Sequence, residues 1–300
     1  MTAQMKSIDV RAEDDEVMQV AKRLRDHPQF PAALRRYTEG VTQFRAGPRL
    51  LNKLISYKAR FHVVGYLMYL DADRERYGPY GGATYARLLD VCTRWQHATP
   101  RTLKTVLALL KLARLVRVEH TPDDARVKLY RPTDHLFSFV ITWLTYALSA
   151  LDCMDPAGDR VSKMKADFDF VRGYQVRGGR AYVEGESVTD RAPNLKHFFE
   201  RDGGFPVLAG TMQAYFDDAP SPSRNELARR FSLSKTQVGN IFEDGFVRGF
   251  YERDAEGAIV PTPSLIDEYA RYASIELAFT AVHFRDPLAA GIPQPASIET

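Results

Sequence analysis

The most constraining feature of this sequence is that its second half repeats the pattern of its first half. Short motifs return in the same order, pairing Tyr37-x-Glu39-Gly40 with Tyr182-x-Glu184-Gly185, Phe61, Val63 and Met68 with Phe205, Val207 and Met212, Thr99 with Ser234, and Pro132-Thr133 with Pro261-Thr262. The offset between paired positions shrinks stepwise along the chain, as deletions in surface loops would produce. We therefore interpret the chain as an internal duplication.

Each repeat has the pattern for the same series of elements. A long apolar helix (about 50–71 and 194–217) is followed by two shorter helices, a strand, a turn, a strand and a long closing helix (about 134–151 and 264–283). We expect a mainly α fold with small β-hairpins, in which two domains are flanked by long helices. The predicted division is an N-terminal helical arm at 1–36, a first domain at 37–152, a polar connector at 153–181, a second domain at 182–284 and a C-terminal tail at 285–300.

The arm contains an amphipathic segment at 15–27. Its apolar side is formed by Val17, Val20, Ala21 and Leu24. We expect this helix to pack across the first repeat, and the C-terminal tail to fray.

The centre of the first repeat has a helix start. Thr99 has the side chain of an N-cap, and Pro100 suits the first helical position, where its missing N–H has no partner in any case. The spacing i, i+3, i+4, i+7 predicts a buried face made of Leu103, Val106, Leu107 and Leu110. The outward positions are then Arg101, Thr102, Lys104 and Thr105. Two strands, LVRVEH and RVKLYRP, are predicted around a hairpin tip at TPDDA.

The second repeat follows the same order. Ser234 is the predicted N-cap, and the buried face consists of Val238, Ile241, Phe242 and Gly245. The outward residues are Lys235, Thr236, Gln237 and Asn240. Gly249 is placed to end the helix, and residues 250–253 and 258–262 are expected to form a hairpin around the turn at 254–257.

This order of elements resembles the winged helix-turn-helix of bacterial transcription regulators, in which a helix and a turn precede a capped second helix and a β-hairpin. The MarR type is the most similar, because long helices flank its DNA-reading module. The resemblance covers about 84–131 and 223–262, most specifically TPRTLKTVLALLKLARLVRVE and ELARRFSLSKTQVGNIF. The chain departs from that family because the module occurs twice and because both hairpin tips are acidic, with Asp123 and Asp124 in one and Asp254 and Glu256 in the other. A wing contact with DNA would then have to come from Arg126 and Lys128 on the strand.

The formal net charge is only +3, so a DNA-binding surface must come from local charge. Between Thr84 and Arg117 there are seven basic residues and one acidic residue, whereas residues 221–253 contain six basic and four acidic residues. The first module is therefore the stronger expected DNA reader. The predicted DNA-contacting set is Arg94, Thr99, Pro100, Arg101, Thr102, Lys104, Thr105, Arg126, Ser234, Lys235, Thr236, Gln237 and Asn240.

These features predict a sequence-specific regulator of transcription that binds double-stranded DNA with two recognition helices in one chain. A plasmid-type replication initiator, which also pairs two winged helices, is the alternative within the same class. From another class, the second module would dock on a protein such as RNA polymerase, with the uncharged helix at 136–151 forming a homodimer interface. Measuring the mass in solution discriminates these arrangements. No small-molecule effector is assigned.

Other classes of function have little support in the sequence. Cys92 and Cys153 are too far apart for a metal cluster or disulfide framework, and the seven histidines lack HxxxH or HExxH spacing. No nucleotide-binding or hydrolase motif occurs, and RGGR at 177–180 reads as an isolated turn. We expect no enzyme activity, no cofactor, no secretion signal and a cytoplasmic, nucleoid-associated protein. The segment 136–151 is too short for a membrane span and is interpreted as a buried helix.

Two further side-chain groups have competing interpretations. His97 precedes the first recognition helix and is expected to be a solvated turn residue, the alternative being a phosphate contact. The aromatic residues Trp95, Phe137, Phe139, Trp143 and Tyr146 are interpreted as core, the alternative being the lining of an effector pocket.

Overall fold

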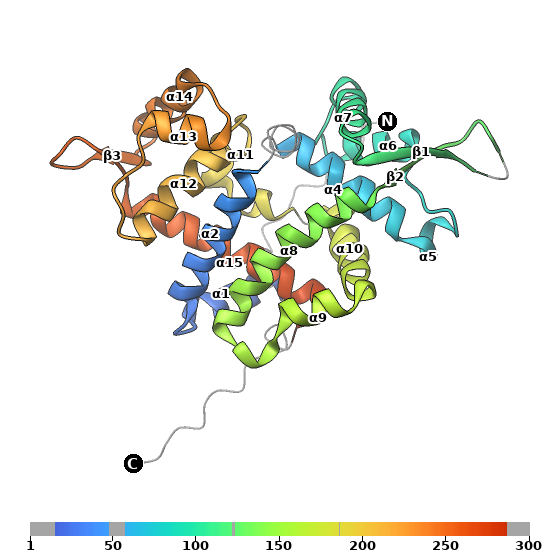
Figure 1. Ribbon diagram of the computed structural model, residues 1–300, viewed down its shortest axis with the longest axis horizontal. Coiled ribbons are helices and arrows are strands. Elements are labelled where there is room, and N and C mark those ends of the chain that lie inside the picture. Colours follow the sequence, from blue (N-terminus) through green and yellow to red (C-terminus); the bar gives the residue numbers. More distant parts are fainter. Residues whose placement is uncertain (1–15, 48–57, 122–123, 186, 287–300) are drawn as a thin grey trace, which may run out of the picture.

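The computed structural model describes residues 16–47, 58–121, 124–185 and 187–286 (Figure 1). It is mainly helical, with two small antiparallel two-stranded sheets. The first half contains α1 (Glu16–Asp26), α2 (Phe30–Arg45), α4 (Lys58–Ala72), α5 (Arg74–Tyr77), α6 (Tyr85–Arg94), α7 (Pro100–Leu112), β1 (Val116–His120), β2 (Lys128–Pro132) and α8 (Asp134–Met154). The second half contains η1 (Pro156–Gly158), α9 (Arg160–Ala166), α10 (Phe168–Val183), η2 (Val188–Arg191), η3 (Pro193–Leu195), α11 (Lys196–Phe199), α12 (Gly204–Phe216), α13 (Arg224–Phe231), α14 (Lys235–Val247), β3 (Tyr251–Arg253), β4 (Ile259–Pro261) and α15 (Pro263–Phe284).

The series α4, α6, α7, β1, β2, α8 recurs as α12, α13, α14, β3, β4, α15. This is the order of elements predicted for the two repeats, with the short α5 added in the loop of the first. The predicted helical residues 50–57, the tip residue Asp123 and the tail beyond 286 lie outside the described residues. In the hairpins, Val118 pairs with Tyr130 and Glu252 pairs with Val260.

The long helices in front of the two series each pack on both of them. α2 packs on α8 of the first series and on α12 of the second, and α10 packs on α4 of the first and on α15 of the second. Figure 1 shows α2 beside α12 and α10 below α4, on the other side of the molecule. α4 and α12 are buried around most of their circumference, as expected for helices enclosed by others. These contacts join the two halves through the core.

The helix at the N-terminal end of the described chain packs on a different repeat from the one predicted. Its buried residues are the predicted Val17, Val20, Ala21 and Leu24. They pack on α15 of the second series, however, and Arg25 forms an ion pair with Asp267 at 2.6 Å. The expectation that α1 packs across the first repeat is therefore wrong. The amphipathic pattern defines which face is buried but not which of two similar repeats covers it.

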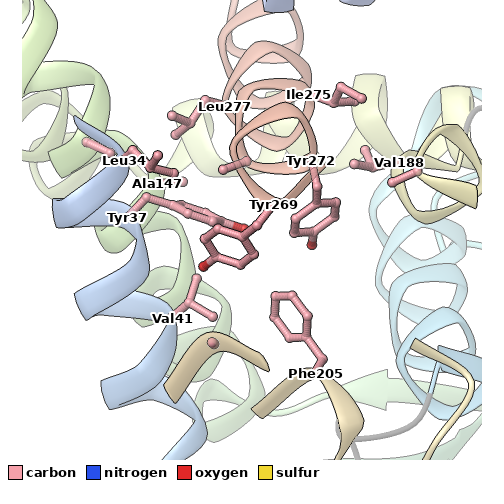
Figure 2. Close-up of a cluster of buried hydrophobic side chains, with 14 of the residues drawn as sticks. Leu34, Tyr37, Val41, Ala147, Val188, Phe205, Tyr269, Tyr272, Ile275 and Leu277 are labelled. Atoms are coloured by element: carbon pink, nitrogen blue, oxygen red, sulfur yellow. The ribbon is translucent and has the colours of Figure 1, made fainter. Parts of the chain in front are cut away.

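The core between α2, α12 and α15 is rich in tyrosine (Figure 2). Tyr37 from α2 and Tyr269 from α15 lie side by side, with Phe205 from α12 nearby. The Tyr269 hydroxyl donates a hydrogen bond to Thr38 Oγ1 at 3.2 Å. A buried tyrosine needs such a partner for its hydroxyl, and here the partner comes from the other half of the chain.

The connector region is largely helical. RGGR at 177–180 lies inside α10, so its interpretation as an isolated turn is wrong. A Cβ on Gly179 would approach the Tyr69 side chain to 2.5 Å, and one on Gly178 would lie 3.2 Å from the Phe279 ring. The two glycines therefore allow α10 to approach α4 and α15 closely.

The single helix predicted at 194–217 is broken. α11 ends at Phe199 and α12 begins at Gly204, with Gly203 at φ +82°. A Cβ on Gly204 would come within 2.4 Å of the Phe198 carbonyl oxygen, so the chain turns back on itself here in a way that only glycine permits.

α8 is the one described helix whose length and composition would suit a membrane span. One face of it is fully buried in the core, through Leu144, Leu148 and Leu151. The residues on its other face, including Phe139 and Trp143, are half-buried. The predicted buried helix is thus present, although only one side of it is enclosed, and it packs against α2, α9 and α15.

A carboxyl group lies where the two halves meet. Tyr272 donates a hydrogen bond to Glu276 Oε1 at 2.9 Å. The Glu276 side chain is also surrounded by Tyr37, Tyr174, Tyr182 and Arg45. Burial raises the pKa of Glu276 to about 7, and the Tyr272 hydrogen bond and the nearby Arg45 charge offset only part of this effect.

Glu276→Gln should therefore change how stability depends on pH. Below about pH 4.5 Glu276 is protonated in both the folded and unfolded states. As the pH rises to about 7 the folded protein retains a proton that the unfolded chain has released, so wild-type stability falls by about 3 kcal/mol. Urea unfolding at pH 4.5 and pH 8 should show the variant gaining about that much relative to wild type at pH 8. Glu252→Gln on the exposed face of β3 is the control, and equal pH profiles for wild type and Glu276→Gln would contradict the expectation.

Candidate nucleic-acid interface

The first helix predicted to read DNA, α7, begins and is buried as predicted. Thr99 caps α7, because its Oγ1 accepts a hydrogen bond from the Thr102 N–H at 3.2 Å, and Pro100 is the first helical residue. The buried residues of α7 are Leu103, Val106, Leu107 and Leu110. This burial fixes the helix on α4 and α6 and leaves its N-terminal turns open to solvent on the outer side.

The predicted outward residues divide into two groups. Arg101 and Lys104 are exposed and form no ion pair or hydrogen bond with a described residue through their side chains. Thr102 is half-buried, and its Oγ1 lies 3.0 Å from Thr99 Oγ1, while Thr105 Oγ1 donates to the Arg101 carbonyl at 2.9 Å. The two cationic side chains are thus available to a ligand, whereas the two hydroxyls are partly used within the helix.

Two of the predicted flanking cations are paired with acids. Arg94 contacts Asp90 at 2.6 Å, one turn earlier on α6. Arg126 Nε and Nη2 donate to the two oxygens of Asp124 at 3.1 and 3.2 Å, although its side chain is 92% exposed. Both pairs are on the surface and contribute little to stability, so an anionic ligand can compete for these guanidinium groups. Lys128 on β2 is exposed.

The second recognition helix has the predicted start and buried face. Ser234 caps α14, and the predicted residues Val238, Ile241, Phe242 and Gly245 are buried, together with Gly239. Lys235, Thr236 and Asn240 are exposed. Gly249 follows the helix end at φ +69°, as expected of a residue that stops a helix.

Gln237 does not face outward as predicted. Its backbone N–H donates to Ser234 Oγ at 3.0 Å, and its side-chain Oε1 accepts from the Ser234 N–H at 3.2 Å, which completes a capping box. Its Nε2 donates to the Asp202 carbonyl at 3.4 Å. The spacing Ser-x-x-Gln is itself a signal for this motif. Gln237 is therefore a cap residue, and Asn240 is the exposed amide of this helix.

Charge pairing is denser around α14 than around α7. Arg224 contacts Glu243 at 2.7 Å, and Arg201 forms an ion pair with Asp244. By contrast, the first module has four exposed cationic side chains with no acidic partner among the described residues, namely Arg101, Lys104, Lys111 and Arg114. The first module thus presents the more positive surface.

The two recognition helices lie toward the same edge of the molecule in Figure 1, on opposite sides of the helical body. The β1–β2 and β3–β4 hairpins project away from each other, one beyond each helix. The described chain thereby presents the capped N-termini of α7 and α14, each with a hairpin beyond it.

His97 is neither solvated nor directed at a ligand, contrary to both interpretations. Its side chain is 10% exposed and lies in the α6–α7 turn, with its Nδ1 2.6 Å from His62 Nδ1 and in contact with the Tyr66 hydroxyl. Its Nε2 is 3.6 Å from Asp190, which also forms an ion pair with Lys58. The burial of this turn between α4 and η2 depends on contacts distant in sequence.

Within the described residues, no group of three or more histidine, cysteine, aspartate or glutamate side chains is arranged to hold a metal ion. The candidate site is thus an arrangement of exposed cationic and polar side chains on two helix N-termini. No protein-family model, curated protein or solved structure matches the chain.

Proposed function

We propose that this protein is a sequence-specific double-stranded DNA-binding regulator of transcription with two winged helix-turn-helix modules in one chain. The observation that carries the proposal is the N-terminal part of α7, where Thr99 caps the helix and Arg101 and Lys104 extend from the first turns without internal partners. A capped helix N-terminus presents N–H groups to phosphates, while side chains from its first turns reach base edges in the major groove.

Three features support DNA as the ligand. The supporting helix α6 and hairpin β1–β2 pack on either side of α7, as a reading helix requires. The charged side chains on and just after α7 that have no ion-pair partner among the described residues are all basic. The same arrangement recurs at α14, where Lys235, Thr236 and Asn240 are exposed. Because the exposed residues on the two helices differ, the two half-sites should differ in sequence.

Binding to duplex DNA should depend strongly on salt. Neutralising about six phosphates through the exposed cations would give a slope near −5 in a plot of log K against log salt, since each contributes about −0.9. Fluorescence anisotropy against a genomic fragment library, selected first at low salt, measures this slope. An affinity that does not change with salt, or no binding at low salt, would overturn the proposal.

Arg101→Ala should reduce discrimination between cognate and scrambled DNA, whereas Lys111→Ala should weaken binding to both about equally. Arg101 leaves the first turn of α7, where a bidentate contact with guanine contributes about 1–3 kcal/mol, while Lys111 lies in the last turn and reaches at most the backbone. Both side chains are exposed, so neither substitution should affect folding. Equal losses on both DNAs for both variants would make Arg101 a phosphate ligand and move base recognition to Thr102 and Thr105.

A further inference from the structure

The two proposed recognition helices differ at one matched position. α7 and α14 each contain 13 residues and begin directly after their caps, so Lys104, the fifth residue after the cap of α7, corresponds to Gly239 in α14. Lys104 is exposed, whereas Gly239 is buried. The second helix therefore has no cationic side chain of its own at this position, and a neighbouring element covers the glycine.

The side chain that covers Gly239 is Arg224 of α13, the helix that precedes α14. A Cβ placed on Gly239 would come 3.3 Å from Arg224 Nη1 and 3.9 Å from its Cζ. Apart from the adjacent residues and backbone of α14 itself, no other described atom would lie within 4 Å of that Cβ. Arg224 is the first residue of α13, which starts at a capping box formed by Ser223 and Glu226 and packs on α14. Its guanidinium thus lies where a side chain at position 239 would begin.

Glu243, one turn after Gly239, holds this guanidinium. Its Oε1 accepts a hydrogen bond from Arg224 Nη2 at 2.7 Å. The Arg224 and Glu243 side chains are 40% and 63% exposed, so the pair lies at the surface. Glu243 is the one described residue that forms a hydrogen bond or an ion pair with the guanidinium. A guanidinium carries five N–H donors, so most of them remain available to a ligand.

The acid of this pair has a cost for DNA binding. Glu243 is exposed, like Asn240 one turn earlier, and its counterpart in α7 is the uncharged Ala108. A carboxylate at this place is repelled by phosphates, and pairing with Arg224 compensates its charge. A contact with a phosphate would require only the cation. The paired acid instead favours a role for Arg224 in which the orientation of the guanidinium matters.

An arginine held in one orientation suits the edge of a guanine. Guanine presents its O6 and N7 acceptors in the major groove, and a planar guanidinium donates to both at once. The ammonium group of Lys104 at the matched position of α7 is a flexible point charge and lacks this geometry. The two modules therefore present cations of different chemistry at the same place.

We propose that Arg224 determines the specificity of the second module by contacting a guanine in the major groove, in the space left by Gly239 and in the orientation set by Glu243. This inference rests on the proposed DNA-binding function. It also accounts for a glycine inside α14, which is unfavourable in a helix, because a side chain at position 239 would compete with the guanidinium for space.

The ratio of affinities for selected DNA and for the same DNA with a scrambled second half-site tests the assignment. Arg224→Met should lower this ratio by about tenfold. Arg229→Met is the matched control, because Arg229 is exposed on the same helix and its loss changes the net charge equally. Its ratio should stay within about threefold of wild type. An unchanged ratio in Arg224→Met, whether or not both affinities fall, would overturn the proposal.

Replacing single guanines by 7-deazaguanine locates the contact, because this analogue lacks the N7 acceptor. In wild type, one replacement in the second half-site should weaken binding by about fivefold, and the same replacement should leave the affinity of Arg224→Met unchanged. Equal losses in wild type and Arg224→Met at every guanine of both strands would show that Arg224 does not contact a guanine N7, and would overturn the proposal.

The orienting role of Glu243 has its own readout. Glu243→Gln removes a charge that phosphates repel, so the affinity for scrambled DNA should rise by about twofold or more, while the affinity ratio should fall by about threefold. In the Arg224→Met background, Glu243→Gln should leave the ratio unchanged. An equal fall of the ratio in both backgrounds would show that Glu243 acts independently of Arg224, which contradicts an orienting role.

Failure of this inference differs from failure of the proposed function. A wild-type protein that binds no DNA would overturn both. A wild-type protein that discriminates between the two DNAs, with the same ratio in Arg224→Met and Arg229→Met, would retain the DNA-binding function and overturn only the assignment of Arg224.

Discussion

Replacing Arg160 with methionine should lower the free energy of unfolding by about 3–5 kcal/mol. Arg160 is 2% exposed, and its guanidinium contacts three carboxylates, two from the end of α8 and one from just after α15. Its Nη2 donates to Asp286 Oδ1 at 2.8 Å and to Asp155 Oδ2 at 2.9 Å, and its Nη1 donates to Asp152 Oδ1 at 3.1 Å. Methionine has the length to fill the space but lacks the positive charge and the N–H donors that these three acids contact.

The residues around Arg160 show why its loss should be costly. The contacts join the end of α8, the start of α9 and the residues just after α15, so the two closing helices meet at this guanidinium. A Cβ on Gly158 would approach Arg160 Nη1 to 2.1 Å, which means that the backbone leaves room for the arginine. Burial alone would lower the pKa of Arg160, but its acidic partners raise it above its ordinary value.

Chemical denaturation at neutral pH measures the effect. Arg172→Met is the matched control, because Arg172 is exposed and 4.0 Å from Asp169, and a surface pair of this kind contributes at most about 1 kcal/mol. Adding Asp286→Asn to Arg160→Met should recover part of the loss, since it removes the most buried of the three carboxylate charges that contact Arg160. A loss from Arg160→Met no larger than that from Arg172→Met would show that the cluster contributes no more than a surface pair.

The second large effect concerns whether both recognition helices bind one DNA molecule. The double variant Lys235→Glu with Asn240→Glu places acidic groups on the outer face of α14 and should reduce DNA affinity by about 10²–10⁴-fold. Linked binding makes the second contact intramolecular, and gains of this size are lost when one module no longer engages. The variant leaves Gln237 unchanged, because altering that residue would also break the helix cap.

Footprinting distinguishes the outcomes. The tandem model requires the loss of one protected segment while the other remains. The control, Ser162→Glu with Lys163→Glu, alters net charge by the same amount on exposed positions of α9, which lies at the opposite edge of the molecule from α14 in Figure 1. If the α14 variant keeps two protected segments and matches the control in affinity, α14 does not read DNA. The second module would then be assigned to protein docking, consistent with the ion pairs that occupy Glu243 and Asp244.

The local parts of the fold can be predicted from the amino-acid sequence alone. The starts of α7 and α14, their buried faces and both hairpins follow from capping side chains, helical spacing and turn residues. These signals operate between residues within about one or two turns of each other, so the sequence contains them completely. The capping box of Gln237 belongs to the same class, since the spacing Ser-x-x-Gln is sufficient to indicate it.

How these parts combine depends on tertiary contacts that local patterns do not specify. In a duplicated chain, an amphipathic helix such as α1 meets two similar apolar surfaces, and its periodicity does not distinguish α15 from the first repeat. The packing of α2 and α10 on both series and the burial of His97 likewise depend on side chains brought together from distant segments. Such choices follow from the complementarity of whole surfaces, because a helical pattern specifies that a face is buried but not what covers it.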